Sequence, residues 1–366
     1  MSFRTAFFAA TTPLFIAVPS LAADSGNIAS AQTETKSGTD APVFTVNDNK
    51  LTFAYIFSGT DPGTFSVKQG GGYNGKTTKQ TYQFSHFDGW KYGTNSLLIS
   101  MYKSSHNDPA SPCTQPGQLI NGAKADCAGS TQIYGLWRST FGLNEITGTR
   151  TFAIGPLRNL SLEIGGDAST QNTYFATDKR VFVGGLQFAF DLPYRGFFNV
   201  APLYYKENNH KAFAQCGLFG PGNPGVSCLS DGNVRYHGTW AIETNYSMEL
   251  DFLPDSMRFF SISGRAAWYG PKGDQNAPLP TRGVGPNSTA TKTEFSSEPI
   301  RLTFDASKAF WGRDRSHLVD MWVAYRYWQN KFGLDHNASP GTCIVAGVNT
   351  KSCTESSLFS GVTVKF

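Results

Sequence analysis

Residues 235–252 read RYHGTWAIETNYSMELDF, and their alternation decides the fold class. One set of alternate positions carries mostly large apolar side chains: Trp240, Ile242, Tyr246, Met248 and Leu250. The positions between them carry polar side chains: Glu243, Asn245, Ser247, Glu249 and Asp251. Successive side chains of a β-strand point to opposite faces of the sheet. The segment is therefore predicted to be a strand with one face against apolar material and the other against water.

Eleven further runs of this kind are separated by clusters of turn-forming residues, which makes twelve in all. The runs begin at Leu51, Gln80, Thr94, Thr131, Arg158, Lys179, Gly196, Arg235, Met257, Glu298, His317 and Leu358. In the run from Glu298 to Ser307, Ile300 and Leu302 oppose Arg301 and Thr303. An even number of half-apolar strands is typical of bacterial membrane barrels. We expect an all-β fold, a transmembrane antiparallel β-barrel of about 12 strands.

The connections between the runs differ in length in a regular way. Those after the odd-numbered runs are mostly long, and those after most even-numbered runs are short, with residues 142–156 as the exception. A membrane barrel has long external loops and short periplasmic turns. A water-soluble β-sandwich would also alternate, and it remains the alternative fold.

The N-terminus has the pattern of a secretory signal, with Arg4 before an apolar stretch and small residues before Asp24. We expect a signal peptide over residues 1–22, a disordered periplasmic segment over 23–48 and the barrel over 49–366. Elsewhere no stretch approaches the ~18 to 20 apolar residues of a membrane-spanning helix. The last strand ends in Phe366, as outer-membrane barrels commonly do. The predicted location is the bacterial outer membrane, with its lipid and the barrel-assembly machinery as partners.

Six cysteines fall into three close pairs within loop-like segments: Cys113 with Cys127, Cys216 with Cys228, and Cys343 with Cys353. Export to an oxidising compartment favours disulfides, and no pair has the CxxC spacing of a zinc or redox site. We expect three local disulfides that close external loops.

Composition limits the function further. The chain has 14% aromatic residues and 38 glycines beside a mean hydropathy of −0.29. These values suit strands of which alternate residues face lipid. The net charge of +4 is too small to indicate nucleic-acid binding.

Charged and aromatic side chains on the predicted inner faces are candidates for lining a pore. The pore-lining candidates are Glu163, Asp167, Glu243, Glu249, Asp251, Arg265, Arg301, Asp305, Asp320, Trp322 and Arg326, and Tyr269 and Trp328 share these faces. Such charges can equally serve only to neutralise one another inside the barrel, without any role in solute passage. If the predicted register of a strand is wrong by one residue, the candidates named on that strand face lipid instead. Trp90, Tyr92 and Trp311 are assigned instead to the aromatic girdles.

Catalysis is not indicated by the sequence. Only His86 and His237 of the six histidines are placed within predicted strands, and no serine stands in a distinctive nucleophile setting. No metal or cofactor motif is present, so we predict neither enzyme activity nor a cofactor.

Two stretches carry a resemblance to a known family. TYQFSHFDGWKYGTNSLLISMYK (81–103) and RSTFGLNEITGTRTFAIGPLRNLSLEIGGDAST (138–170) resemble the Tsx-type nucleoside-specific channels of the Gram-negative outer membrane, and WVAYRYW (322–328) is similar to their penultimate strand. The three cysteine pairs depart from the better-known members. The resemblance implies a monomeric barrel of twelve strands with a narrow lumen that passes nucleosides passively.

Two other functions stay open. One is a small general porin, or a pore selective for another compact solute such as a sugar or an aromatic acid. The other is a plugged structural or surface-receptor barrel whose disulfide-braced loops bind partners.

Overall fold

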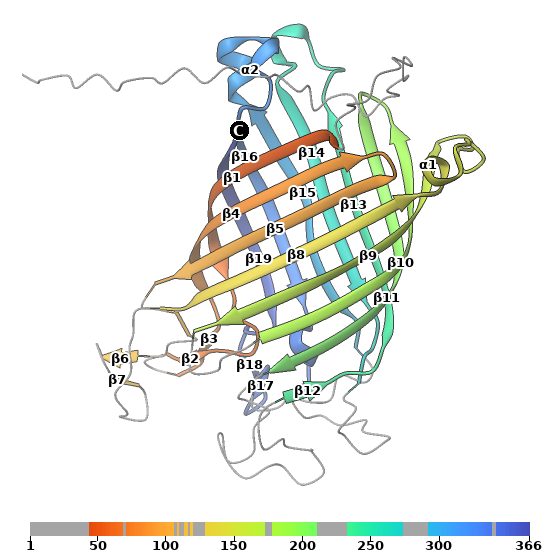
Figure 1. Ribbon diagram of the computed structural model, residues 1–366. Coiled ribbons are helices and arrows are strands. Elements are labelled where there is room, and N and C mark those ends of the chain that lie inside the picture. Colours follow the sequence, from red (N-terminus) through yellow and green to blue (C-terminus); the bar gives the residue numbers. More distant parts are fainter. Residues whose placement is uncertain are drawn as a thin grey trace, which may run out of the picture.

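Twelve long strands pair in chain order into one closed antiparallel barrel (Figure 1). The computed structural model describes residues 44–68, 71–105, 108–109, 113–115, 118–119, 129–172, 178–210, 233–273, 292–338 and 342–366. The barrel strands are β1 (Phe44–Gly59), β4 (Thr77–Trp90), β5 (Gly93–Ser104), β8 (Thr131–Gly142), β9 (Leu157–Gln171), β10 (Asp178–Leu192), β11 (Gly196–His210), β13 (Thr239–Glu249), β14 (Phe260–Tyr269), β15 (Glu294–Asp305), β16 (Val319–Gln329) and β19 (Thr354–Lys365). The ring closes where β1 pairs with β19. A sandwich would need two separate sheets, so that alternative is excluded and the predicted barrel is confirmed.

Shorter elements lie in the connections. Three are small hairpins: β2 (Ser66–Val67) with β3 (Tyr73–Asn74), β6 (Cys113–Gln115) with β7 (Gln118–Leu119), and β17 (Ile344–Val345) with β18 (Val348–Asn349). The strand β12 (Asn233–Arg235) pairs with the end of β11. The helices are α1 (Leu143–Thr147), α2 (Ala306–Trp311), η2 (Asp255–Met257), η3 (Arg313–Arg315) and η4 (Lys331–Gly333). Within the described residues, no helix is long and apolar enough to cross a membrane.

The connections sort onto two ends of the barrel. The long-loop end carries those after β1, β5, β9, β11, β14 and β16, and the short-turn end carries those after β4, β8, β10, β13 and β15. Figure 1 shows α2 at the short-turn end and the β17–β18 hairpin at the other. Antiparallel neighbours require this arrangement, because consecutive connections alternate between the two ends. The predicted alternation of the connections between the two ends is confirmed. The connection after β15 (306–318) is longer than predicted because it contains α2 and η3, and the predicted exception at 142–156 contains α1.

Most predicted strand boundaries shift by a few residues, and three differences matter for the description of the barrel. Residues 44–48, expected in the disordered lead-in, pair with β4 as the beginning of β1. His237, expected inside a strand, lies between β12 and β13, where its amide donates to the Lys272 carbonyl at 2.8 Å. The run that was expected to continue to Ser307 ends at Asp305, because the Asp305 carboxylate accepts the Lys308 amide and caps α2. Residues 1–43, with the predicted signal peptide, lie outside the described chain.

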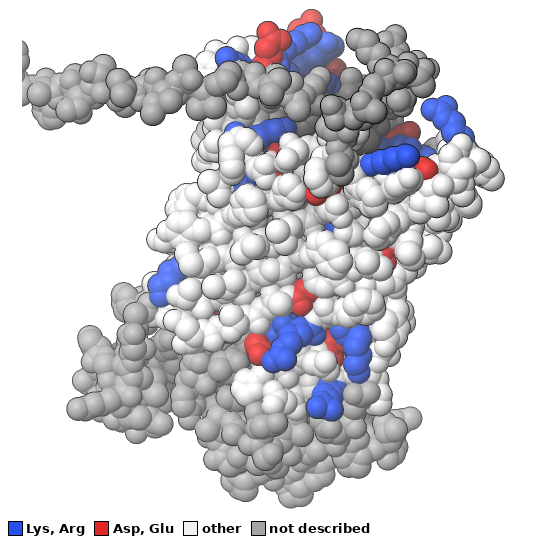
Figure 2. Space-filling view, in the orientation of Figure 1, with Lys and Arg blue, Asp and Glu red and all other residues white. Residues whose placement is uncertain are grey.

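The outer face of the barrel carries a belt of exposed apolar side chains. Alternate residues of every part of the wall contribute to this belt, among them Leu51, Phe53, Ile99, Leu162, Phe182, Ile242, Leu302, Val323, Leu358 and Val362. Figure 2 shows a mostly uncharged middle zone, with lysine, arginine and acidic residues gathered towards the two ends. The alternation predicted for β13, β15 and β19 therefore corresponds to an apolar outside and a polar inside.

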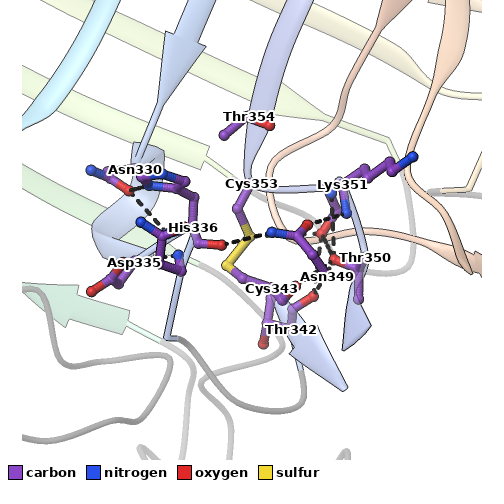
Figure 3. Close-up of a disulfide and its surroundings, with 12 residues drawn as sticks. Asn330, Asp335, His336, Thr342, Cys343, Asn349, Thr350, Lys351, Cys353 and Thr354 are labelled. Carbon is purple, nitrogen blue, oxygen red and sulfur yellow. Dashed lines mark hydrogen bonds between the residues drawn. A yellow bond between two sulfur atoms is a disulfide. The ribbon is translucent and has the colours of Figure 1, made fainter. Parts of the chain in front are cut away.

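A single disulfide, Cys343–Cys353, is present among the described residues (Figure 3). It closes a ten-residue separation in the connection between β16 and β19, with Cα atoms 5.6 Å apart. The hydroxyl of Thr350 donates to the carbonyl oxygens of Thr342 and Cys343 beside it. This predicted pair is confirmed. Cys127, Cys216, Cys228 and the side chain of Cys113 lie outside the described residues, so the other two disulfides stay predictions.

Two apolar clusters occupy opposite parts of the interior. The first packs Val183, Leu203 and Tyr205 of β10 and β11 with neighbours on β13 and β14. The second packs Ile56, Trp322 and Phe359 with neighbours on the same strands β1, β16 and β19. The polar space that remains inside the barrel, lined in part by Ala201 and Tyr269 of the first cluster, is called the slot.

Candidate functional site

A polar cavity of about 470 Å³ lies inside the barrel. On β8, its lining extends from Gln132 to Thr140, which is nearly the whole strand. Five acidic and five basic residues line it: Glu163, Asp167, Glu243, Glu294, Glu298, Arg138, Lys179, Arg265, Arg326 and Lys331. Its size lies in the range of sites for small organic molecules.

Arg138 crosses the lumen to reach a strand that is not its neighbour. Its Nη2 and Nε lie 2.7 and 3.0 Å from the two carboxylate oxygens of Glu243, although β9, β10 and β11 stand between β8 and β13 in the ring. The same guanidinium donates to Asp167 at 2.6 Å, and its Nε lies 3.7 Å from Glu163. This two-pronged geometry matches the planar fork of arginine. Arg138 thus joins three carboxylates and bounds the slot on one side.

A glycine lets Arg138 take this path. Gly165 is paired with Arg138 on β9, and a Cβ at position 165 would lie 2.6 Å from the Arg138 Cδ and 2.3 Å from the Trp137 carbonyl oxygen. No side chain fits at that distance. The guanidinium can therefore lie along the wall before it turns to Glu243.

Arg326 bounds the slot on the other side. Its guanidinium carbon lies 5.5 Å from the ring centre of Tyr102 on β5, with β4, β1 and β19 between the two strands in the ring. Its Nε also contacts Glu355 of the neighbouring strand at 2.8 Å. Deeper in the wall, Arg301 stacks 3.9 Å over Trp322 and pairs with Glu298 at 2.6 Å. The slot is thus bounded by one arginine at each side and by aromatic rings.

Lys331 enters the cavity from the long-loop end rather than from a strand. The residues on both sides of it, Asn330 and Phe332, have left-handed backbone conformations with φ of 61° and 55°. Both are held in place: the side-chain amide of Asn330 donates to the Thr293 carbonyl at 2.9 Å, and the Phe332 carbonyl accepts the Tyr236 hydroxyl at 2.8 Å. A phenylalanine at positive φ is strained and needs such support.

A second charged cluster lies at the short-turn end of the barrel. His317 Nδ1 lies 3.1 Å from Asp320, and its Nε2 lies 3.3 Å from Glu249. Burial opposes the charged imidazole, but the hydrogen bonds to Asp320 and Glu249 prevail and raise the pKa of His317 to about 10. Asp305, His317 and Asp320 bring their ligand atoms within 4.8 Å of one another. Both Asp305 oxygens already accept hydrogen bonds, from Ser307, Ser316 and two backbone amides, so the imidazolium, rather than a metal, is the cation of this cluster.

The predicted pore-lining candidates are divided between three places. The cavity is lined by Glu163, Asp167, Glu243, Arg265 and Arg326, and also by Tyr269. Glu249, Asp305 and Asp320 surround His317 at the short-turn end. Arg301 and Trp322 face inwards within packed parts of the wall, and Trp328 lines a second, smaller hollow. Asp251 is a correction, because it follows the end of β13 and pairs with Arg195 of another turn at 2.9 Å.

Several lining residues were missed by the sequence prediction. For Arg138 a signal existed, since Ile133 and Trp137 mark the outer face and leave Arg138 inside. Lys179 alternates with Arg180 and Phe182 in the same way. For Lys331 no signal existed, because it lies outside the strand pattern.

The fold and the site define a closed twelve-stranded barrel with a polar slot. No protein-family model matches this chain, and no curated protein matches it. Several solved structures are similar at low levels, among them the following three. The TodX deltaS2S3 mutant monoaromatic hydrocarbon channel shares 9% identity over 89% of this chain and 90% of that chain, with a TM-score of 0.36. The translocator domain of the autotransporter NalP from Neisseria meningitidis shares 11% over 88% and 89%, with a TM-score of 0.37. OccAB2 of Acinetobacter baumannii shares 9% over 89% and 100%, with a TM-score of 0.28. Likenesses at this level say nothing about the solute.

Proposed function

We propose that this chain is a monomeric, passive channel of the bacterial outer membrane for small polar solutes. One observation carries the proposal: a closed sheet with an apolar outer belt encloses a polar cavity that extends along nearly all of β8. A closed barrel satisfies its backbone hydrogen bonds within lipid, and its alternating faces place water inside. A water-soluble protein has no use for so large an exposed apolar band.

The finer part of the proposal is the solute, for which nucleosides are the first candidate. The resemblance to Tsx-type channels motivates it, and the slot contains groups that suit a flat base and a ribose. The rings of Tyr102, Tyr134 and Tyr269 line the cavity, and stacking on an aromatic ring contributes ~1 to 3 kcal/mol per base. Glu163 and Gln187, joined at 2.7 Å, and Asn245 offer hydrogen-bonding groups for hydroxyls.

Liposome swelling tests both the existence of the channel and its selectivity for nucleosides. Liposomes that contain the purified chain should swell in thymidine and adenosine faster than in sugars of similar mass. Equal rates for all solutes would leave a general porin and reject selectivity. Absence of swelling, with ion conductance near zero in a planar bilayer, would reject the channel and support a plugged barrel.

A further inference from the structure

The direct ion pairs inside the barrel gather on some of its cations and leave others without one. Each carboxylate that lines the cavity is already within salt-bridge distance of a cation: Glu163, Asp167 and Glu243 with Arg138, Glu294 with Lys272, and Glu298 with Arg301. Among the cations of the cavity, Arg326 is paired with Glu355. Among the described residues, no carboxylate lies within that distance of Lys179, Arg265 or Lys331, which line the same cavity.

The three cations line one cavity, and two of them also share a second hollow. Lys179 comes from β10, Arg265 from β14 and Lys331 from η4, so three separate elements direct positive charge into one slot. Lys179 and Lys331 line a second, smaller hollow as well, which adjoins Tyr102 and Tyr134. Their neighbours are aromatic: Lys179 lies 5.8 Å from the ring centre of Tyr269, and Lys331 lies 4.9 Å from that of Trp328. A cation over a ring is only weakly compensated in comparison with an ion pair.

The charge state of Lys331 agrees with this crowding. Burial, together with the positive charges of Arg326 and Lys179, lowers the pKa of Lys331 to about 7. Like charges held together without a counterion repel one another, and an anion between them removes the repulsion. The long-loop end thus holds Lys331 beside two other cations, with Glu294 and Glu355 as opposing charges that lie outside salt-bridge distance.

We propose that Lys179, Arg265 and Lys331 bind the anionic group of a small aromatic organic anion, whose ring lies against the tyrosines of the slot. The proposal rests on the proposed channel and replaces its first solute candidate, a neutral nucleoside, with a ring-bearing anion. A carboxylate or a phosphate ester would satisfy the same three cations, since both accept several charge-assisted hydrogen bonds. The slot thereby favours the charged form of a ring-bearing solute over its neutral counterpart.

Planar-bilayer recordings test the proposal with matched ligands and variants. In a KCl gradient the reversal potential should show chloride preferred over potassium. Thymidine 5′-monophosphate and benzoate should block the current at concentrations at least tenfold lower than thymidine and benzamide do. Comparing the two anions distinguishes a phosphate solute from a carboxylate one. Acetate should block poorly, and block by acetate equal to that by benzoate would overturn the aromatic part.

The variants Lys179→Gln, Arg265→Gln and Lys331→Gln should each reduce the chloride preference, and the triple variant should reverse it, since the Arg138 cluster keeps a net negative charge. Arg180→Gln is the control, because Arg180 is the next residue on β10, is 76% exposed in its side chain and faces outwards. It should behave like the unaltered chain. Heat-modifiable migration on gels establishes that each variant is folded.

The recordings distinguish failure of the proposed channel from failure of the proposed anion site. A chain without conductance would overturn the channel itself and this proposal with it. A conducting chain without chloride preference, or a triple variant that keeps the original selectivity, would overturn the anion site and leave the channel standing.

Discussion

Arg138 on β8 and Glu243 on β13 are joined across the lumen by two hydrogen bonds of 2.7 and 3.0 Å. Three strands separate them around the wall, so the pair spans the interior. The side chains of both are largely withdrawn from water, at 10% and 19% exposure. The bond therefore bounds the slot and holds distant parts of the ring together.

Replacing Arg138 should lower the free energy of unfolding more than replacing Glu243 does. Arg138→Gln leaves Glu163, Asp167 and Glu243 facing one another without a cation, and the loss of a buried partner destabilises by about 3–5 kcal/mol. Glu243→Gln leaves the guanidinium with Asp167 and should cost roughly 1–2 kcal/mol. Urea unfolding in lipid vesicles, followed by tryptophan fluorescence, measures both. Equal losses of unfolding free energy in the two variants would show that the three carboxylates do not depend on Arg138 as their common cation.

Anion preference should decline between pH 6 and pH 8. Lys331, with a pKa near 7, is charged below this pH and neutral above it. The charged groups that act on it are Arg326 of β16, Lys179 of β10, Glu294 of β15 and Glu355 of β19. Block by thymidine 5′-monophosphate should therefore weaken several-fold as the pH rises.

Lys331→Gln should remove most of this pH dependence. A second group must be controlled, because burial raises the pKa of Asp61 to about 7 as well. Asp61→Asn should leave most of the dependence in place. If Asp61→Asn abolishes it and Lys331→Gln does not, the assignment to Lys331 is refuted.

Loss of the His317 proton should make the barrel less stable at alkaline pH. Its pKa is raised from 6.5 to about 10 on folding, so its contribution is fully present below pH 6.5 and is lost as the pH rises towards 10. His317→Gln should lower the unfolding free energy at pH 6 by roughly 1–3 kcal/mol and flatten its decline. Urea midpoints at pH 6 and pH 10.5 compare the two chains. A variant that declines as steeply as the original would contradict the assignment.

The disulfide should stabilise its loop and not the barrel. Cys343–Cys353 closes a short loop, which contributes about 3 kcal/mol in the chain-entropy model. None of the twelve strand pairings includes either cysteine. Cys343→Ser with Cys353→Ser, or reduction alone, should leave heat-modifiable migration intact while proteolysis within 330–353 becomes faster. Loss of heat-modifiable migration would show that the bridge holds the barrel.

Arginine should be tolerated on one face of β13 and not on the other. Ile242 is 38% exposed on the outer belt, whereas Asn245 lines the cavity. Ile242→Arg should reduce stability in vesicles by ~2–4 kcal/mol, since the charge would face hydrocarbon. Asn245→Arg should cost less than 1 kcal/mol and alter ion selectivity instead. The reverse order would mean that β13 is inverted.

Local sequence patterns predicted most of the wall. Alternation at period two indicated which faces of β13, β15 and β19 point outwards, and the spacing of Cys343 and Cys353 predicted their disulfide. These features depend on neighbours along the chain, because each strand pairs with the next through a hairpin or a loop. The beginning of β1 escaped prediction because residues 44–48 follow a long polar segment and contain only two apolar residues, Phe44 and Val46, although they pair with β4.

By itself, the sequence determined that the chain forms a barrel of twelve strands with an apolar outside and a charged inside, since a period of two and the hairpin connections are local properties. Only the tertiary structure decided which inward charges meet. Arg138 reaches Glu243, and Lys331 enters from a loop, because closure of the ring brings together residues that are more than a hundred positions apart or outside any strand. No periodic pattern records such distances, and they depend on how the closed sheet curves and on which side chains fill its interior.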